Sequence, residues 1–130
     1  MANSNTPILH RWFHEVWNSK DKIAIDRLMH SSAIIVDIAT RETYVGSQYI
    51  KKKFDELQKK YSAIKFIVHE GISGIDIEAA KCTIVVVLDG DEHQADFTAL
   101  IKIEDGKIVL TSNDADLKIA RVIDEKLLVV

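Results

Sequence analysis

Apolar residues recur every three to four positions in three segments of the first half of the chain, a spacing that places them on one side of a helix. The first segment runs from about Pro7 to Trp17, and its apolar stripe is Leu9, Trp12, Phe13, Val16 and Trp17. The second is short, follows Asp21 as its predicted N-cap and ends near residues 30–32, with Ala24, Ile25, Leu28 and Met29 on its apolar face. The third follows Gly46, with Ser47 as the predicted N-cap, and its buried face is Ile50, Phe54, Leu57 and Tyr61.

Beyond Ala63 apolar and polar positions alternate, a pattern that is typical of strands. The predicted long strands begin at Ala63 and cover 78–88, 93–103 and 107 to about 116. Asp89-Gly90 and Asp105-Gly106 predict tight hairpins, and Gly71 and Gly74 predict a bulge or bend. The β-branched run 33–37 and the short run 43–45 predict two further strands between the helices.

Helices followed by strands joined through short turns indicate the α+β class. The length of 130 residues fits a single domain, residues 1–130, with a core of about 8–117, a tail at 1–6 and a C-terminal extension at 118–130. Either a helix or an added strand is compatible with that extension. Long strands twist and curl, so we expect a cone-shaped, curved antiparallel sheet, mixed at its edge, that three N-terminal helices cover around an internal pocket.

Composition narrows the function classes. A net charge of −3 speaks against a nucleic-acid partner. The one cysteine, Cys82, lies in an apolar run and has no partner for a disulfide. His10 and His14 stand one helical turn apart, but no third ligand is near them in sequence, so we predict no metal site. The absence of a long apolar stretch and of a signal-peptide pattern predicts a cytoplasmic protein with no membrane contact.

Several segments carry a resemblance to a known family. Residues 11–18 (RWFHEVWN), the spacing Asp21…Ile25…Leu28, Gly46-Ser47 and the closing segment 101–109 (IKIEDGKIV) resemble SnoaL-like polyketide cyclases. These belong to the nuclear transport factor 2-like, or cystatin-like, superfamily, together with the ketosteroid isomerases. The resemblance spans about residues 8–117 and implies a curved-sheet domain that binds a small hydrophobic organic ligand without a cofactor.

The resemblance also implies site residues. Asp37 stands where ketosteroid isomerases carry their general base, at the end of the first strand. The places of their two oxyanion donors are held by Phe13 and Ala99, which have no donor to offer, so steroid isomerisation is disfavoured. SnoaL-like cyclases carry a histidine and an aspartate two positions apart on the last strand, and the counterparts are Asp114 and Asp116.

Strand parity leaves two alternatives at that last strand. One orientation turns Thr111, Asn113 and Ala115 inward, and a single bulge turns Asp114 and Asp116 inward instead. Both Asn113 and Asp114 therefore remain candidate catalytic residues beside Asp37. The residues predicted to line the pocket are Phe13, Trp17, Tyr44, Phe54, Phe97, Ala99 and Asp116.

Two kinds of function are compatible with these features. The first is a cofactor-independent isomerase, cyclase or dehydratase with Asp37 as general base. The alternative is a non-catalytic ligand-binding or dimerisation module. A cavity in which Asp37 meets another polar group favours the enzyme, whereas a cavity plugged by phenylalanines favours the module; those phenylalanines are Phe13, Phe54, Phe66 and Phe97.

The strand at 83–88 is apolar on both of its faces, and Ile67 and Leu100 add apolar side chains to the face that the helices do not cover. Large exposed apolar patches are rare on monomers. We therefore predict a homodimer through the outer face of the sheet. The alternative is that residues 127–130 fold back over the same face.

Overall fold

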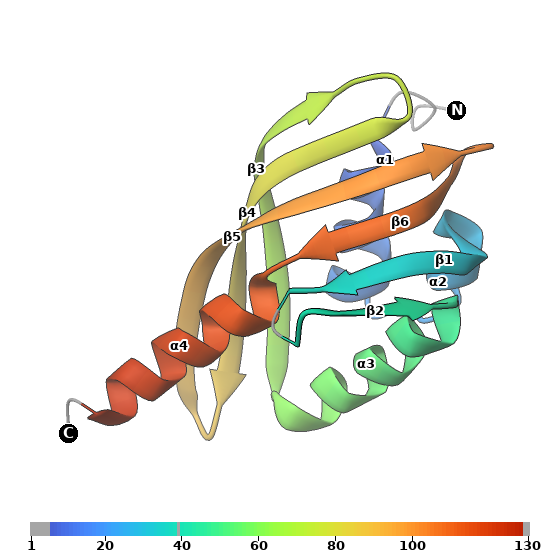
Figure 1. The fold of residues 1–130 in the computed structure, drawn as a ribbon. Coiled ribbons are helices and arrows are strands. Elements are labelled where there is room, and N and C mark those ends of the chain that lie inside the picture. Colours follow the sequence, from blue (N-terminus) through green and yellow to red (C-terminus); the bar gives the residue numbers. More distant parts are fainter. Residues whose placement is uncertain (1–5, 39, 129–130) are drawn as a thin grey trace.

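The computed structural model describes residues 6–38 and 40–128, with the side chains of residues 126–128 excluded. A six-stranded sheet in the order β2-β1-β6-β5-β4-β3 forms the centre of the molecule (Figure 1). Its strands are β1 (Met29–Asp37), β2 (Glu42–Val45), β3 (Ala63–Ser73), β4 (Ile77–Leu88), β5 (Asp91–Glu104) and β6 (Lys107–Asn113). The helices are α1 (Ile8–Arg11), the π-helix η2 (Trp12–Asn18), α2 (Ala24–Leu28), α3 (Ser47–Lys60) and α4 (Ala115–Leu128). The predicted α+β class is confirmed.

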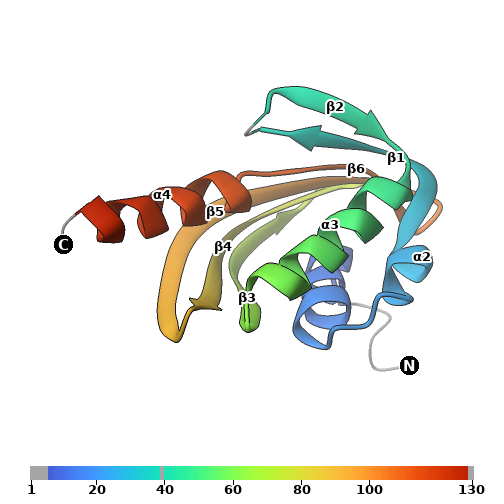
Figure 2. The ribbon, with the colours of Figure 1, turned by 90° about the horizontal axis from the view of Figure 1, so that it is seen from below.

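The sheet curls, and α1, η2 and α3 lie on its concave side (Figure 2). Strand β5 shows how the pleat divides the two faces, because its buried positions alternate with exposed ones and are His93, Ala95, Phe97, Ala99 and Ile101. The core is aromatic at its centre. The ring of Phe66 lies 4.8 Å from that of Phe13 and 5.8 Å from that of Phe97, and the ring of Trp17 lies 5.7 Å from that of Phe66.

The predicted first helix is present, but its second half has a wider turn than an α-helix. In η2 the chain makes i→i+5 contacts, and the pattern ends with the Ser19 N–H donating to the His14 carbonyl at 2.9 Å. This turn brings residues five positions apart towards the same face. Trp12 and Trp17 are consequently both buried on the concave side of the sheet.

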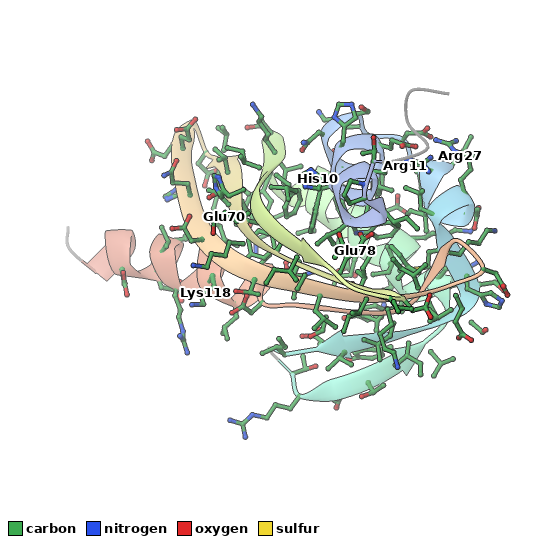
Figure 3. All side chains as sticks on the ribbon, turned by 90° about the horizontal axis from the view of Figure 1, so that it is seen from above. His10, Arg11, Arg27, Glu70, Glu78 and Lys118 are labelled. Carbon is green, nitrogen blue, oxygen red and sulfur yellow. The ribbon has the colours of Figure 1, made fainter. Side chains whose placement is uncertain are left out.

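Hydrogen bonds between side chains and backbone join this N-terminal segment to the sheet. Glu78 of β4 lies beside α1 (Figure 3), and its carboxylate accepts from the N–H groups of Ile8 and Leu9 at 3.3 and 2.8 Å. Backbone donors at a helix start otherwise lack partners. At the other end, Asn18 accepts from the Phe66 N–H at 2.7 Å and donates to the Phe66 carbonyl at 2.8 Å. These bonds use the backbone of the edge strand β3.

Two predicted helix boundaries are wrong. Strand β1 begins at Met29, directly after α2, because residues 29–32 already extend along the sheet before a register shift between Met29 and Ile34. Ser47 does not cap α3: it is inside the helix and buried, and the residue before the helix is Gly46, with φ of 110°. Only glycine adopts this backbone conformation without strain. Asp21 accepts from the Ile23 N–H at 3.1 Å, in the turn that precedes α2.

The last strand ends at Asn113, not near residue 116, and the C-terminal extension is helical. The Asn113 Oδ1 accepts from the Ala115 N–H at 3.1 Å, an i→i+2 bond that forms an Asx-turn in front of the helix. The first helical bond runs from the Lys118 N–H to the Asp114 carbonyl at 3.0 Å, so Asp114 is the N-cap residue. Helix α4 then packs along the part of β5 that β6 does not reach (Figure 1). The alternative that residues 127–130 fold back over the sheet falls on the end of the chain. Residues 129–130 and the side chains from residue 126 onward lie outside the described part of the structure.

The turn and bulge predictions are confirmed. Asp89-Gly90 and Asp105-Gly106 all have positive φ, as two-residue hairpin turns of this type require. The pairing of β3 with β4 shifts between Val68 and Gly71. Among the described residues, no helix combines the length and apolar character needed to cross a bilayer.

We expect Phe54→Ala to lower the free energy of unfolding by about 3–5 kcal/mol, because Phe54 is buried on α3 with its ring 5.4 Å from that of Trp17. Leu57 is half-buried, so Leu57→Ala should cost about 1–2 kcal/mol. Urea denaturation measures both, with exposed Lys59→Ala as the control. Equal losses for Phe54→Ala and Lys59→Ala would contradict the packing of this face.

Candidate functional site

A cavity of about 80 Å³ lies where the ends of β1 and β6 meet η2, α3 and the first turn of α4. Aromatic side chains form much of its wall, namely Trp12, Phe13, Trp17, Tyr49 and Phe66. Its polar side chains come from four elements and are Asp37, Tyr49, Lys53, Thr111, Ser112, Asn113 and Asp116. An apolar wall with a few converging polar groups is typical of a small-molecule site.

Asp37 and Asn113 are neighbours in this cavity. They are register partners in the parallel pairing of β1 with β6, as are Ile35 and Thr111 two residues earlier. Alternate residues of a strand point to one face, so Thr111 and Asn113 project from β6 on the side to which Asp37 projects from β1. A carboxylate acceptor and two hydrogen-bond donors thereby lie together at the end of the strand pair.

Tyr49 of α3 fixes the carboxylate of Asp37. Its hydroxyl donates to Asp37 Oδ2 at 2.8 Å, while the Thr40 N–H donates to Oδ1 at 3.3 Å. The Tyr49 ring stacks on Tyr44 with centroids 4.0 Å apart. Burial, followed by the hydrogen bond to Asp37, raises the pKa of Tyr49 well above its ordinary value. Tyr49 therefore stays a hydrogen-bond donor throughout the physiological pH range.

The two donors on β6 differ in what they contact. Thr111 is only 6% exposed, and its hydroxyl makes no hydrogen bond to any other residue that the structure describes. The Asn113 Oδ1 is occupied by the Ala115 N–H, which leaves the Nδ2 group as the part of this side chain available to donate. The Thr111 oxygen is not among the buried atoms that lack a partner, so it is accessible from the cavity that Thr111 lines, where a ligand atom can bond to it.

Lys53 and Asp116 lie at the more exposed side of the cavity. Their Nζ and Oδ2 atoms are 3.4 Å apart, and Lys53 Nζ also lies 5.9 Å from the centroid of the Tyr49 ring. The pair connects α3 to the first turn of α4. The charged lining therefore consists of two carboxylates, Asp37 and Asp116, and one ammonium group.

Within the described residues, no group of three or more His, Cys, Asp or Glu side chains has an arrangement that would hold a metal ion. Burial raises the pKa of the Cys82 thiol to about 11, which makes this thiol a poor nucleophile.

The profile of the SnoaL-like domain matches residues 9–111. This chain belongs to the SnoaL-like domain family. The family predicted from the sequence is therefore confirmed. No curated protein sequence matches this chain.

Solved structures with the same fold have little sequence in common with this SnoaL-like protein. IdmH from Streptomyces antibioticus, a proposed polyketide cyclase, has a TM-score of 0.78 at 13% identity, covering 90% of this chain and 96% of that chain. A ketosteroid isomerase-like protein from Catenulispora acidiphila, in complex with trimethylamine, has a TM-score of 0.73 at 13% identity and covers 85% of both chains. An epoxide hydrolase from M. tuberculosis has a TM-score of 0.71 at 10% identity, covering 95% and 94%. These similarities establish the nuclear transport factor 2-like fold and leave the activity open.

The structure brings together some of the predicted site residues of this SnoaL-like protein. Asp37, Asn113, Phe13, Trp17 and Asp116 all line the cavity. Asp116 does so from α4, not from a strand. Of the two orientations that parity left open, the structure has the one that turns Thr111, Asn113 and Ala115 inward.

The other predicted residues lie elsewhere. Asp114 is on the outer face, where it accepts from the Thr98 N–H at 3.1 Å in a shallow groove with Glu70 and Lys118 (Figure 3). Its place follows from the end of β6 one residue earlier. Phe54, Phe97 and Ala99 are in the core behind the cavity wall, and Tyr44 stacks on the far side of Tyr49. None of these four lines the cavity.

Sequence reasoning missed Tyr49 and Lys53. The predicted buried face of this helix, which is Ile50, Phe54, Leu57 and Tyr61, includes neither of them. A signal was available, because Tyr49 and Lys53 are four residues apart and flank the buried positions Ile50 and Phe54 on the helix. That spacing places them along one border of the buried face, where side chains reach past the helix into a cavity.

We expect the free energy of unfolding of Tyr49→Phe to decrease less steeply with rising alkaline pH than that of the wild type. The pKa of Tyr49 is raised in the folded protein, so the unfolded chain releases this proton first, near its ordinary value of about 10. Stability is then complete below about pH 10 and falls above it by up to about 1.4 kcal/mol per pH unit. Urea denaturation between about pH 9 and 11 on both proteins measures the difference. The same slope in the two proteins would show that the Tyr49 hydroxyl is solvated.

Proposed function

We propose that this protein is a cofactor-independent enzyme that moves a proton within a small organic molecule, as an isomerase, cyclase or dehydratase, with Asp37 as the general base. The observation that carries this proposal is the pairing of Asp37 with Asn113 at the ends of two parallel strands that open into one cavity. A base and a donor at adjacent positions are what removal of an acidic C–H requires.

The chemistry assigns a role to each group. Asp37 takes the proton from a carbon next to a carbonyl group, and the C–H electron pair becomes an enolate whose charge collects on the oxygen. Thr111 and Asn113 donate to that oxygen, and the aromatic wall keeps water away, which strengthens both bonds. Asp37 returns the proton to the same carbon or to another one.

Tyr49 orients the base. Its hydrogen bond to Oδ2 and the Thr40 N–H bond to Oδ1 hold the carboxylate in one position. A base held in this way loses less entropy on reaching the transition state. Tyr49 is therefore a positioning residue in this proposal.

A ligand-binding module without catalysis is the second candidate, and the packing of the cone supports it. Phe13, Phe66 and Phe97 fill the centre with ring centroids 4.8–5.9 Å apart. The remaining cavity at the mouth is small. Trimethylamine in the C. acidiphila protein is an example of a small ligand in this fold.

We also propose a homodimer through the outer face of the sheet, and we retain the cytoplasmic location as part of the proposal. Ile34 and Ile67 are 38% and 37% exposed on that face. Val85, Val87 and Leu100 are half-buried beside them on the pleat. A second copy that covers these side chains would remove their apolar surface from water.

We expect Asp37→Asn to slow proton exchange by at least about 100-fold, because the amide is a much weaker base of the same shape. The measurement is deuterium uptake at the carbons next to the carbonyl of hydroxyacetone and pyruvamide, followed by NMR in D₂O. Asp55→Asn is the matched control, since Asp55 is an exposed residue of α3 that forms an ion pair with Lys22. Exchange that is equal in wild type and Asp37→Asn would rule out this base.

We expect sedimentation equilibrium to give a dimer at micromolar concentration and Ile67→Glu to convert it to a monomer, since a charge in an apolar interface is costly. Ile23→Glu is the matched control, because Ile23 is 71% exposed in the turn before α2, away from the sheet. A monomeric wild type, or equal effects of the two variants, would remove the dimer from the proposal.

A further inference from the structure

We infer that the ligand of this cavity is a small uncharged carbonyl compound and is neither an anion nor a ring system. This inference rests on the proposed function for the reaction, but it concerns a separate property, which is the size and charge that the cavity admits. Three observations carry it: the volume, the charge balance and the unpaired donors.

The volume sets the size. An apolar cavity of about 150 Å³ accommodates benzene, and the space here is about 80 Å³. Enlarging it requires movement of buried aromatic residues, since Trp12, Phe13 and Trp17 are at most 6% exposed. Phe13 and Trp17 also contact the ring of Phe66, which lines the same cavity. A six-membered ring therefore does not reach Thr111 and Asn113.

The charged side chains of the lining determine which ligand charge the cavity accepts. Two carboxylates and one ammonium group line the cavity, and Asp116 already holds the ammonium of Lys53 at 3.4 Å. The ammonium group of Lys53 is the one cation among the lining residues and lies in this ion pair, so an anion beside the carboxylate of Asp37 would have to compete with Asp116 for it. Like charges brought together in a confined, partly desolvated site repel strongly. A carboxylate-bearing substrate is consequently disfavoured.

The donors set the functional group. The Thr111 hydroxyl lines the cavity and makes no hydrogen bond to another described residue, and the Asn113 Nδ2 is the end of its amide that does not hold the Ala115 N–H. Thr111 and Asn113 are two positions apart on β6, so their side chains lie on the same face of this strand. A carbonyl oxygen accepts two hydrogen bonds, so it satisfies both donors at once. The geometry places the carbon next to that carbonyl beside the register partner Asp37.

Pyruvamide and pyruvate test the charge, because they have the same number of non-hydrogen atoms and differ in replacing a carboxylate by an amide. We expect wild type to exchange the methyl protons of pyruvamide in D₂O at least about tenfold faster than those of pyruvate. β-Tetralone tests the size and should exchange at least about tenfold more slowly as well. Uncatalysed exchange in buffer is subtracted for each compound.

Thr111→Val tests the donor. Valine has the shape of threonine without the hydroxyl, and we expect it to slow exchange of pyruvamide by about tenfold or more. Thr98→Val is the matched control on the exposed face of β5. Circular dichroism and urea denaturation verify that both variants fold.

A binding measurement separates this inference from the reaction. Saturation-transfer NMR reports binding of each compound to wild type and to Asp37→Asn, without any need for turnover. Binding of pyruvamide alone, with no exchange, supports the ligand class and overturns the proposed reaction. Exchange of pyruvate or β-tetralone as fast as that of pyruvamide supports the reaction and overturns the ligand class. Absence of both binding and exchange for all three compounds overturns both.

Discussion

The parallel pairing of β1 with β6 is the contact on which the rest of the structure depends. It joins a strand that follows the first helices to the last strand of the chain, with Ile35 opposite Thr111 and Asp37 opposite Asn113. Through this pairing the short hairpin β1–β2 becomes part of the curved sheet. The same register determines which side chains meet at the strand ends, so the fold and the cavity have a common origin. A shift by one residue would turn every one of these side chains to the other face.

The aromatic core determines how much of the cone remains open. Phe13, Phe66 and Phe97 pack against one another in the centre, and the π-helix η2 adds two tryptophans to the same side. An α-helical turn would separate Trp12 from Trp17 around the helix axis, whereas the wider turn brings them to one wall. Empty space is therefore confined to the mouth, where polar residues from β1, β6, α3 and α4 converge. The size of that space is a property of the core packing and not of the polar residues.

The resemblance to ketosteroid isomerases points to Asp37 as the base of the proposed reaction, but it does not account for the hydrogen-bond donors. Phe13 and Ala99 stand where donors are expected from that resemblance, and both are buried among apolar side chains. Hydrogen-bond donors are instead available at Thr111 and Asn113, which belong to β6, the strand that pairs with β1. A fold carries its chemistry in sites that change independently of the scaffold. The absence of the expected donors thus speaks against one reaction and does not exclude proton transfer as a class.

Local chemistry determined much of this protein from its sequence. The hairpins at Asp89-Gly90 and Asp105-Gly106, the bulge before Gly71 and the helical stripes all depend on residues close together in the chain. Asp37 was accessible through the resemblance, because it ends the first predicted strand, where ketosteroid isomerases carry their general base. Tertiary structure decided what depends on several distant elements at once. The end of β6 was set by the Asx-turn of Asn113 in front of α4, the place of Tyr49 by its hydrogen bond to Asp37, twelve residues away in the chain, and the position of Asp116 by a helix that the pattern left open. Periodicity describes one segment at a time, whereas a cavity is the space left where segments pack, and only their packing decides which side chains face it.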